Sequence, residues 1–380
     1  MKEIEKIIKA YSATNWDEER AALGTVVKVE ESAYRRIGAR MYVSSKGDWT
    51  GGISGGCLEG DALKRAQIAI NKNQSSIVVY DTMDDDSHQI GVGLGCNGRI
   101  EVMFTPVDPE DTANPIEFLK TITDTRETEA LLQILSNDRE KTGSTGADKA
   151  EDSLIGKFYP YSQLHHLIQA TGIAQADIDT SINEAKRKRK SRVFHLSNQS
   201  GERFEVLVEL IRPKIKVICI GDNYDVNAFV SIVHEMGWEI HVAGKLRKLS
   251  KELFRMTKST CEYADAHKIS IDEHTAVVLM SHDYKTDYQL LQHFIKHDVP
   301  YIGLLGPKKR MIKMQNELAD EGKNIDLESM PNLFAPVGLD IGAESPEEIS
   351  LSIASEIITT LRRREGTSLR KRLGPIHERD

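Results

Sequence analysis

The sequence is poor in the features that define several protein classes. Its four cysteines, Cys57, Cys96, Cys219 and Cys261, are too few for a disulfide scaffold in 380 residues. No apolar run approaches the roughly 18 residues of a membrane-spanning helix, and the charged start, Met1 to Lys6, predicts no signal peptide. Acidic residues outnumber basic ones, 58 to 50, so nothing general attracts nucleic acid or anionic lipid. We therefore expect a cytoplasmic protein with no nucleic-acid or membrane partner.

The apolar share of the chain, 39%, is that of an ordinary globular protein. Because 380 residues are more than one core usually organises, we expect two domains. In the second half, apolar strands at 216–220, 275–280 and 301–305 alternate with helical stretches. That alternation is typical of a parallel sheet covered on both faces. The predicted fold class is α/β, with an N-terminal α+β domain and a C-terminal Rossmann-like, doubly wound parallel-sheet domain.

Composition divides the chain into three parts. Residues 1–107 form the predicted N-terminal domain, 108–204 a polar connecting region, and 205–380 the Rossmann-like domain. Within the middle part, 137–152 has almost no apolar residue and is expected to be an exposed loop. The basic run at 186–190 is interpreted as a solvated helix face or loop, because an acidic protein is a poor match for nucleic acid.

The turn after the strand at 216–220 is where a Rossmann fold would hold a dinucleotide. It reads Gly221-Asp222-Asn223-Tyr224-Asp225-Val226, whereas the usual fingerprint has glycine at three positions. Gly221 fits, and Asn223 tolerates a left-handed backbone but carries a side chain where the pyrophosphate would lie. About 20 residues further on, where an acid would hold the ribose, the chain has Ala243 to Lys248 and no acid. The pattern favours the fold more than it favours NAD(P) binding, and a retained fold with an altered pocket stays open.

Two cysteines of the first half lie in glycine-rich segments. Cys57 follows Gly55-Gly56 and precedes a predicted helix, where backbone N–H groups and the helix dipole stabilise an anion such as a thiolate. Cys96 follows Gly95 in a segment whose amides can form a nest for a phosphate or a thiolate. Neither belongs to a Cys-x-x-Cys pair, so structural zinc is not expected. The alternative for each is a small buried residue in a tight turn.

Three arginines, Arg35, Arg36 and Arg40, lie close together between two predicted strands. Arginine suits bidentate contacts with phosphate or carboxylate, and a solvated loop is the alternative. In the second half, His282 and Asp283 end a predicted strand, where sites in open α/β sheets gather. His282 can relay a proton or bind a metal there, and a capping or packing role is the alternative.

Two further loops are candidates for ions. The acidic run 81–86 suits a hard cation, although a solvated acidic turn explains it equally simply. The glycine loop 336–342 precedes a helix that opens with the capping box Ser345-Pro346-Glu347-Glu348. A glycine loop entering a helix is suited to an anion.

Together these segments resemble the XdhC/CoxI family, the accessory factors of xanthine dehydrogenase and related molybdenum hydroxylases. The strings that carry the resemblance are Ser32-Ala33-Tyr34-Arg35-Arg36-Ile37-Gly38-Ala39-Arg40-Met41, Ile53-Ser54-Gly55-Gly56-Cys57-Leu58-Glu59-Gly60, Met280-Ser281-His282-Asp283-Tyr284 and Ala335-Pro336-Val337-Gly338-Leu339-Asp340-Ile341-Gly342. They cover both ends of the chain but not the polar middle.

The resemblance implies a two-domain protein, often a homodimer, that binds the molybdenum cofactor (molybdopterin). Such proteins support its sulfuration by a partner cysteine desulfurase and deliver it to the apo-enzyme of a xanthine dehydrogenase-type molybdenum hydroxylase. By this resemblance Cys57 is the candidate to contact molybdenum or the transferred sulfur, as catalytic residue and metal ligand, and a soft thiolate suits that role. His282 is the second catalytic candidate. The candidate cofactor-binding residues are Arg35, Arg36, Arg40, Ser54, Gly55, Gly56, Cys57, Gly95, Cys96, Gly221, Asn223, His282 and Asp283.

Three functions remain open at this point. The resemblance favours a cofactor chaperone without turnover of its own. The alternative is an NAD(P)-dependent oxidoreductase, which would need a working phosphate turn at 221–226. The third is a protein–protein adaptor, in which both cysteines would be replaceable. The catalytic chain of a molybdenum hydroxylase is not expected, because four cysteines do not suffice for its iron–sulfur clusters.

Overall fold

The structure is a computed structural model that describes residues 1–31, 34–81, 98–111, 114–138 and 153–372. The chain forms two compact units. Unit 1 comprises Met1–Pro213 with Arg372, and unit 2 comprises Lys214–Lys371. Among the described residues, none of the helices has both the length and the apolar character of a membrane span.

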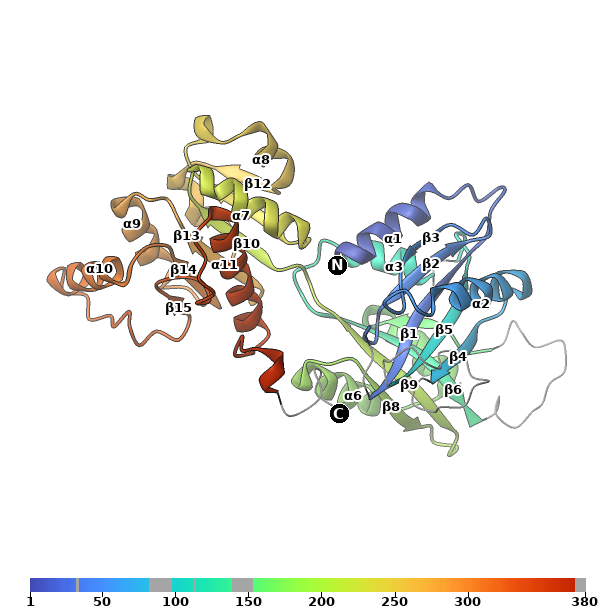
Figure 1. The fold of residues 1–380 in the computed structure, drawn as a ribbon. Helices are drawn as coiled ribbons and strands as arrows, with labels where there is room; N and C mark the ends of the chain where they lie inside the picture. Colours follow the sequence, from blue (N-terminus) through green and yellow to red (C-terminus); the bar gives the residue numbers. More distant parts are fainter. Residues whose placement is uncertain (32–33, 82–97, 112–113, 139–152, 373–380) are drawn as a thin grey trace. The chain divides into compact units, whose positions relative to one another are not determined.

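Unit 1 opens with an antiparallel five-stranded sheet in the order β3-β2-β1-β5-β4 (Figure 1). Its strands are β1 (Ala21–Glu31), β2 (Arg40–Ser44), β3 (Trp49–Gly51), β4 (Ser76–Asp81) and β5 (Gly98–Val107). Helix α2 (Glu59–Lys72) covers one face, because its alanines at i, i+4 and i+7 (Ala62, Ala66 and Ala69) are all buried. Helix α1 (Lys2–Ala13) buries Ile7 and Tyr11 in a neighbouring core.

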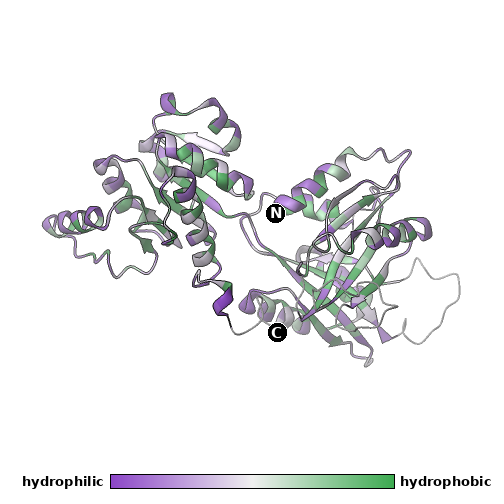
Figure 2. Cartoon of the chain, in the orientation of Figure 1, coloured by the Kyte–Doolittle hydropathy of each residue, from purple (hydrophilic) through white to green (hydrophobic). Residues whose placement is uncertain are grey.

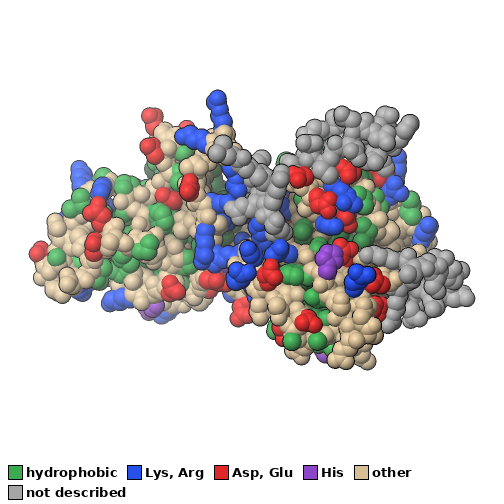
Figure 3. Space-filling view, turned by 90° about the horizontal axis from the view of Figure 1, so that it is seen from below, with side chains coloured by type: hydrophobic (Ala, Val, Ile, Leu, Met, Phe, Trp, Pro, Cys, Tyr) green, Lys and Arg blue, Asp and Glu red, His purple; other side chains and the backbone are tan. Residues whose placement is uncertain are grey.

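A second, four-stranded antiparallel sheet completes unit 1, in the order β7-β6-β9-β8. Its elements are β6 (Glu129–Asn137), β7 (Phe158–Pro160), β8 (Arg192–Ser197), β9 (Arg203–Ile211), α3 (Pro115–Ile122), α5 (Leu164–Thr171) and α6 (Gln175–Lys188). The region 108–204, expected to be a connection, therefore supplies a folded half of unit 1. Its polar composition lies on outward faces, since α6 buries Ile178, Ile182 and Ala185 and exposes the cations at its end. Basic and acidic side chains both appear on the face drawn in Figure 3.

The boundary expected at residue 205 falls inside β9, which pairs with β6 and β8 of unit 1. Of the expected loop 137–152, residues 139–152 lie outside the described part of the chain. The two sheets of unit 1 share a core built from Val27, Met103, Leu135 and Leu207.

A buried ion pair also joins the two sheets of unit 1. Arg40 Nη2 on β2 lies 2.5 Å from Glu209 Oε2 on β9, and the two side chains are 2% and 5% exposed. Arg40 Nη1 also donates to the carbonyl oxygen of Gly38 at 2.8 Å. Gly38 has a φ of +88°, and a Cβ there would overlap the Glu209 carboxylate. Glycine is thus required at 38 both by its backbone conformation and by the ion pair.

Unit 2 is built on a parallel six-stranded sheet in the order β12-β11-β10-β13-β14-β15. The strands are β10 (Lys216–Ile220), β11 (Glu239–Ala243), β12 (Ser259–Cys261), β13 (Thr275–Leu279), β14 (Tyr301–Leu304) and β15 (Leu333–Phe334). Figure 2 shows how apolar these central strands are. The order reverses between β10 and β13, which makes the carboxyl ends of these two strands a topological switch point.

Helices cover both faces of the unit 2 sheet. Helices α7 (Tyr224–Glu235) and α11 (Pro346–Leu361) pack on one face, while α9 (Tyr284–Phe294) and α10 (Lys308–Asp320) pack on the other. Alternate residues of β10 enter the two cores, with Cys219 in the first and Ile220 in the second. The predicted Rossmann-like, doubly wound domain is confirmed, as is the capping box that opens α11.

We expect the Glu209→Gln substitution to lower the free energy of unfolding of unit 1 by about 3–5 kcal/mol, because it leaves the Arg40 guanidinium buried and uncompensated. Urea unfolding would be followed by tryptophan fluorescence in a Trp238→Phe background, where only Trp16 and Trp49 of unit 1 report. Replacing both partners, as in Arg40→Met with Glu209→Leu, should recover most of the loss.

The control for this experiment is Arg203→Ala, which removes an exposed ion pair with Asp138. It should change the unfolding free energy by no more than about 0.5 kcal/mol. A Glu209→Gln protein that unfolds like the wild type would contradict the role given to the pair.

Candidate functional site

The loop between β3 and α2 carries Cys57 and is organised around Ser54. The Ser54 amide donates to Glu59 Oε1 at 2.9 Å, and its hydroxyl donates to Glu59 Oε2 at 2.5 Å. The same hydroxyl oxygen accepts from the amides of Gly56 at 3.2 Å and Leu58 at 3.1 Å. The segment is therefore closed on itself at the start of α2, as in a capping box.

The Glu59 carboxylate stays ionised in this arrangement. Burial acts to raise its pKa, but the hydrogen bonds from the Ser54 side chain and the backbone amides outweigh burial, so the net pKa lies below its ordinary value. A charged carboxylate in the first turn of α2 also interacts favourably with the helix dipole.

Cys57 lies at the outer side of this loop. Its thiol is free and exposed, directly before α2. The preceding Gly56 has a φ of +115°, and a Cβ there would meet no heavy atom within 4 Å. The glycine turn thus leaves open space beside an accessible thiol, and of the two interpretations of Cys57 the buried one is wrong.

The arginine-bearing loop lies against the Cys57 loop. A Cβ built on Gly55 would lie 3.3 Å from Cδ1 of Tyr34, so the Tyr34 ring rests on Gly55. Arg35, the next residue, forms an ion pair with Glu3 of α1, and Arg36 is exposed. The structure therefore brings Arg35 and Arg36 next to the loop of Ser54, Gly55 and Gly56.

Other expected residues of the first half lie elsewhere. Arg40 is buried with Glu209 between the sheets, so its guanidinium is already engaged away from the surface. Gly95 and Cys96, together with most of the acidic run 81–86, lie outside the described residues.

In unit 2, the predicted residues meet at the switch point. A Cβ on Gly221 would lie 2.7 Å from the carbonyl oxygen of Met280, so only glycine fits where β10 ends. Asn223 Nδ2 donates to the carbonyl oxygen of Ser281 at 2.8 Å and ties the ends of β10 and β13 together. The Asn223 side chain thus occupies the turn with a structural hydrogen bond.

His282 and Asp283 have separate roles despite their adjacency. His282 Nε2 lies 2.6 Å from Asp225 Oδ2 in the first turn of α7, and His282 has a φ of +58°. Asp283 caps α9 by accepting from the amide of Thr286 at 2.7 Å, and the hydrogen bonds from Thr286 lower its pKa. The capping alternative is confirmed for Asp283, while the partner of His282 is Asp225.

Two carboxylates at this turn were given no role from the sequence. Asp222 is buried and accepts from the Lys245 amide at 3.0 Å and from Lys248 Nζ at 3.1 Å. Burial acts to raise the pKa of Asp222, but these hydrogen bonds outweigh it and the net pKa is lowered. Asp225 is the other. Their position in the phosphate turn was a visible signal, but their partners lie far along the chain.

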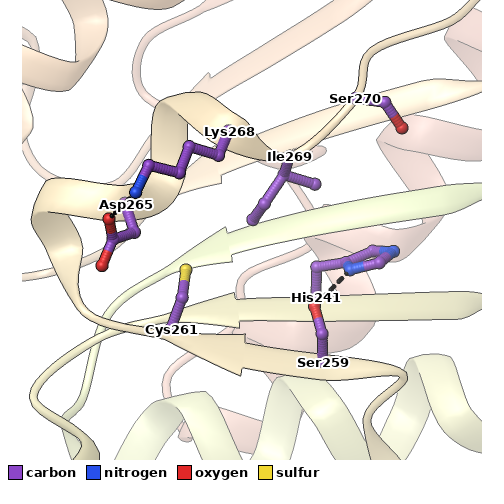
Figure 4. Close-up of a pocket in the computed structure, with 7 residues that line it drawn as sticks. All are labelled: His241, Ser259, Cys261, Asp265, Lys268, Ile269 and Ser270. Atoms are coloured by element: carbon purple, nitrogen blue, oxygen red, sulfur yellow. Dashed lines mark hydrogen bonds and ion pairs between the residues drawn. The ribbon is translucent and has the colours of Figure 1, made fainter.

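Two other places in unit 2 do not extend the site. The amide of Gly338, in the loop expected to suit an anion, donates to the buried Glu356 carboxylate at 2.9 Å. Burial raises the pKa of Cys261, whose thiol is therefore neutral, in a shallow pocket at the sheet edge (Figure 4). That pocket is lined by His241, Ser259, Cys261, Asp265, Lys268, Ile269 and Ser270.

The fold and site define a class of protein with a glycine-loop domain that exposes a thiol, followed by a Rossmann-like domain. Comparison with known families agrees with this description. Residues 17–81 match the sequence model of the "XdhC and CoxI family", and residues 217–357 match that of the "XdhC Rossmann domain". The two matches together cover more than half of the chain. The chain belongs to the XdhC and CoxI family, which confirms the resemblance.

Individual relatives span nearly the whole chain. A protein of Bacillus subtilis (strain 168), named as a probable component of xanthine dehydrogenase, is 27% identical over 91% of this chain and 95% of its own length. The "Molybdenum cofactor insertion chaperone PaoD" of Escherichia coli (strain K12) is 23% identical over 89% of this chain and 82% of its own. A crystal structure described as a xanthine dehydrogenase from Bacillus halodurans has the same fold, with a TM-score of 0.68 and 24% identity over 97% of this chain and 98% of that one.

We expect iodoacetamide to alkylate Cys57 in the native protein, since its thiol is exposed. Cys219 should react only after denaturation, because it is fully buried and burial raises the pKa of its thiol. Peptide mass spectrometry would assign each modified residue, with Cys57→Ser as the control. Equal protection of Cys57 and Cys219 would contradict the exposed position of Cys57.

Replacing Glu59 by Gln should lower the unfolding free energy by about 1 kcal/mol at neutral pH, since charge-assisted hydrogen bonds to Ser54 are lost. Because the folded pKa of Glu59 is depressed, its stabilisation is present above its ordinary pKa of 4.5 and is lost as the pH falls through the lower folded value. Urea unfolding across this pH range should show the Gln variant losing less stability on acidification than the wild type. The exposed Glu110→Gln is the matched control, and identical acid sensitivity of Glu59→Gln and wild type would refute the assignment.

Proposed function

We propose that this protein is an accessory factor that binds the molybdenum cofactor and supplies it to a molybdenum hydroxylase of the xanthine dehydrogenase type. The observation that carries the proposal is the exposed Cys57 thiol, held in a glycine turn at the start of α2. The family membership and the full-length similarity to a protein named as a molybdenum cofactor insertion chaperone support it.

The residues around Cys57 fit such a cargo. A thiolate is a soft ligand of the kind that molybdenum in a sulfur-rich cofactor accepts, and the position before α2 stabilises its negative charge. Gly56 leaves the space beside the thiol open. Arg35 and Arg36 on the adjoining loop provide guanidinium groups of the type that holds a phosphate. Once delivered, the cofactor supplies the metal centre at which the recipient enzyme works.

Each residue then has a distinct task. Cys57 contacts the molybdenum or the sulfur that is transferred to it. Ser54 and Glu59 keep the turn in place, since their mutual hydrogen bonds close the segment. Arg35 and Arg36 hold the phosphate end. Arg40 acts indirectly, by fixing the strand that follows the arginine loop through its pair with Glu209.

The finer steps belong to the same proposal. Sulfuration by a partner cysteine desulfurase requires that the sulfur donor can approach the site, and the exposed position of Cys57 supports this. Delivery to the apo-hydroxylase and assembly as a homodimer follow from the family. The protein acts in this scheme as a chaperone and not as a catalyst with turnover.

The charges in unit 2 argue against the oxidoreductase alternative. The turn after β10 places the Asp222 and Asp225 carboxylates where a dinucleotide pyrophosphate would lie. Lys248, a cation at the end of the next strand, is already paired with Asp222. Like charges repel in such a crevice, so we propose that unit 2 serves as a docking scaffold and not as an NAD(P) site.

Cofactor retention tests the proposal. The purified protein would be incubated anaerobically with molybdenum cofactor and desalted, and pterin fluorescence and molybdenum content would then be measured. We expect close to stoichiometric retention by the wild type and loss of most of the molybdenum by Cys57→Ala, because the thiol ligand is gone. Cys261→Ala, a half-buried thiol of unit 2, is the matched control and should retain the cofactor.

Two outcomes would contradict the proposal. A wild type that retains no cofactor, together with saturable binding of NADH in a fluorescence titration, would favour the oxidoreductase. Full retention by Cys57→Ala would remove Cys57 from the site and leave the adaptor function open.

A further inference from the structure

Tyr34 is an unusual residue at this site. Its side chain is 73% exposed, although an aromatic ring loses favourable hydrophobic free energy when it stays in water. The ring nevertheless has a defined support. A Cβ on Gly55 would lie 3.3, 3.4 and 3.6 Å from three consecutive ring atoms, Cδ1, Cγ and Cε1. One side of the ring therefore rests on the Gly55 backbone, and the rest of it faces solvent.

This contact places the ring within the proposed cofactor site. Gly55 is two residues before Cys57 in the loop closed by Ser54 and Glu59. Tyr34 is followed directly by Arg35, whose guanidinium is anchored to Glu3 of α1, and by the exposed Arg36. The anchored arginine limits the movement of the loop that carries Tyr34. The site thus presents a thiol, an aromatic ring and cationic side chains on two adjoining loops.

We propose that Tyr34 is the stacking surface for the planar ring of the cargo, so that the site selects a flat heteroaromatic group, a pterin, together with its metal-bearing end. This inference rests on the proposed function. Aromatic rings attract planar heterocycles by dispersion and by electrostatic complementarity, and such stacking tolerates variation in the stacked ring. Gly55 is part of the device, because a side chain there would lie within close contact of the ring and displace it.

The order of groups along the two loops matches the order of groups in the ligand. The cofactor carries its metal, its fused ring system and its phosphate in separate parts. Cys57 suits the metal end, Tyr34 the ring and Arg36 the phosphate. A protein partner would also contact an exposed tyrosine, but it would give no reason for the ring to lie beside an accessible thiol.

A metal-free pterin tests this role without involving Cys57. Neopterin would be titrated into wild type, Tyr34→Leu and Tyr34→Phe, with binding read from quenching of pterin fluorescence. We expect Tyr34→Phe to bind like the wild type and Tyr34→Leu to bind about five- to thirty-fold more weakly. Tyr161→Leu, another exposed tyrosine of unit 1, is the matched control and should change nothing. Circular dichroism would confirm that each variant is folded.

The outcomes separate this inference from the proposed function. Loss of neopterin affinity in Tyr34→Leu but not in Cys57→Ala supports the stacking role. Neopterin affinity, or retention of the whole cofactor, that is equal in wild type and Tyr34→Leu would overturn the stacking role and leave the chaperone function standing. A wild type that binds neither neopterin nor cofactor would overturn both.

Discussion

The buried pair between Arg40 and Glu209 is the interaction on which unit 1 depends. A lone guanidinium in a protein interior is strongly unfavourable, so β2 and β9 must come together for either side chain to be buried. The pair also determines Gly38, whose left-handed backbone turns the chain into β2. The loop with Tyr34 and the arginines is therefore fixed at its end near Gly38 by this pair and close to its centre by the contact of Arg35 with Glu3.

The two units use the start of a helix in opposite ways. In unit 1, the loop before α2 folds Ser54 and Glu59 inward and leaves the Cys57 thiol outside. In unit 2, the turn before α7 fills the corresponding position with its own carboxylates and with the Asn223 amide. A helix N-terminus attracts anions in both cases, but only in unit 1 does the turn leave an accessible nucleophilic side chain at that point.

Local patterns in the sequence predicted much of the fold. The β-branched runs gave the central strands of unit 2, and the capping box at Ser345 gave the start of α11, because both signals lie within a few residues. The position of Cys57 before a helix was predicted for the same reason. The folded half at 108–204 was missed, since the buried face of α6 is narrow and its charged residues dominate the composition. The partners of Arg40 and His282 are 169 and 57 residues away in the chain, beyond the reach of any local pattern.

The long separation between Arg40 and Glu209 has a consequence for synthesis. A chain emerging from the ribosome presents β1 and β2 early, but β9 exists only after residue 211 has been made. Until then the Arg40 guanidinium has no carboxylate to enter the interior with, and the core between the two sheets cannot close. Contacts between distant segments are also slow to form. The N-terminal half must therefore wait, partly open, for more than half of the chain to be translated, and the shared core closes only when β9 arrives.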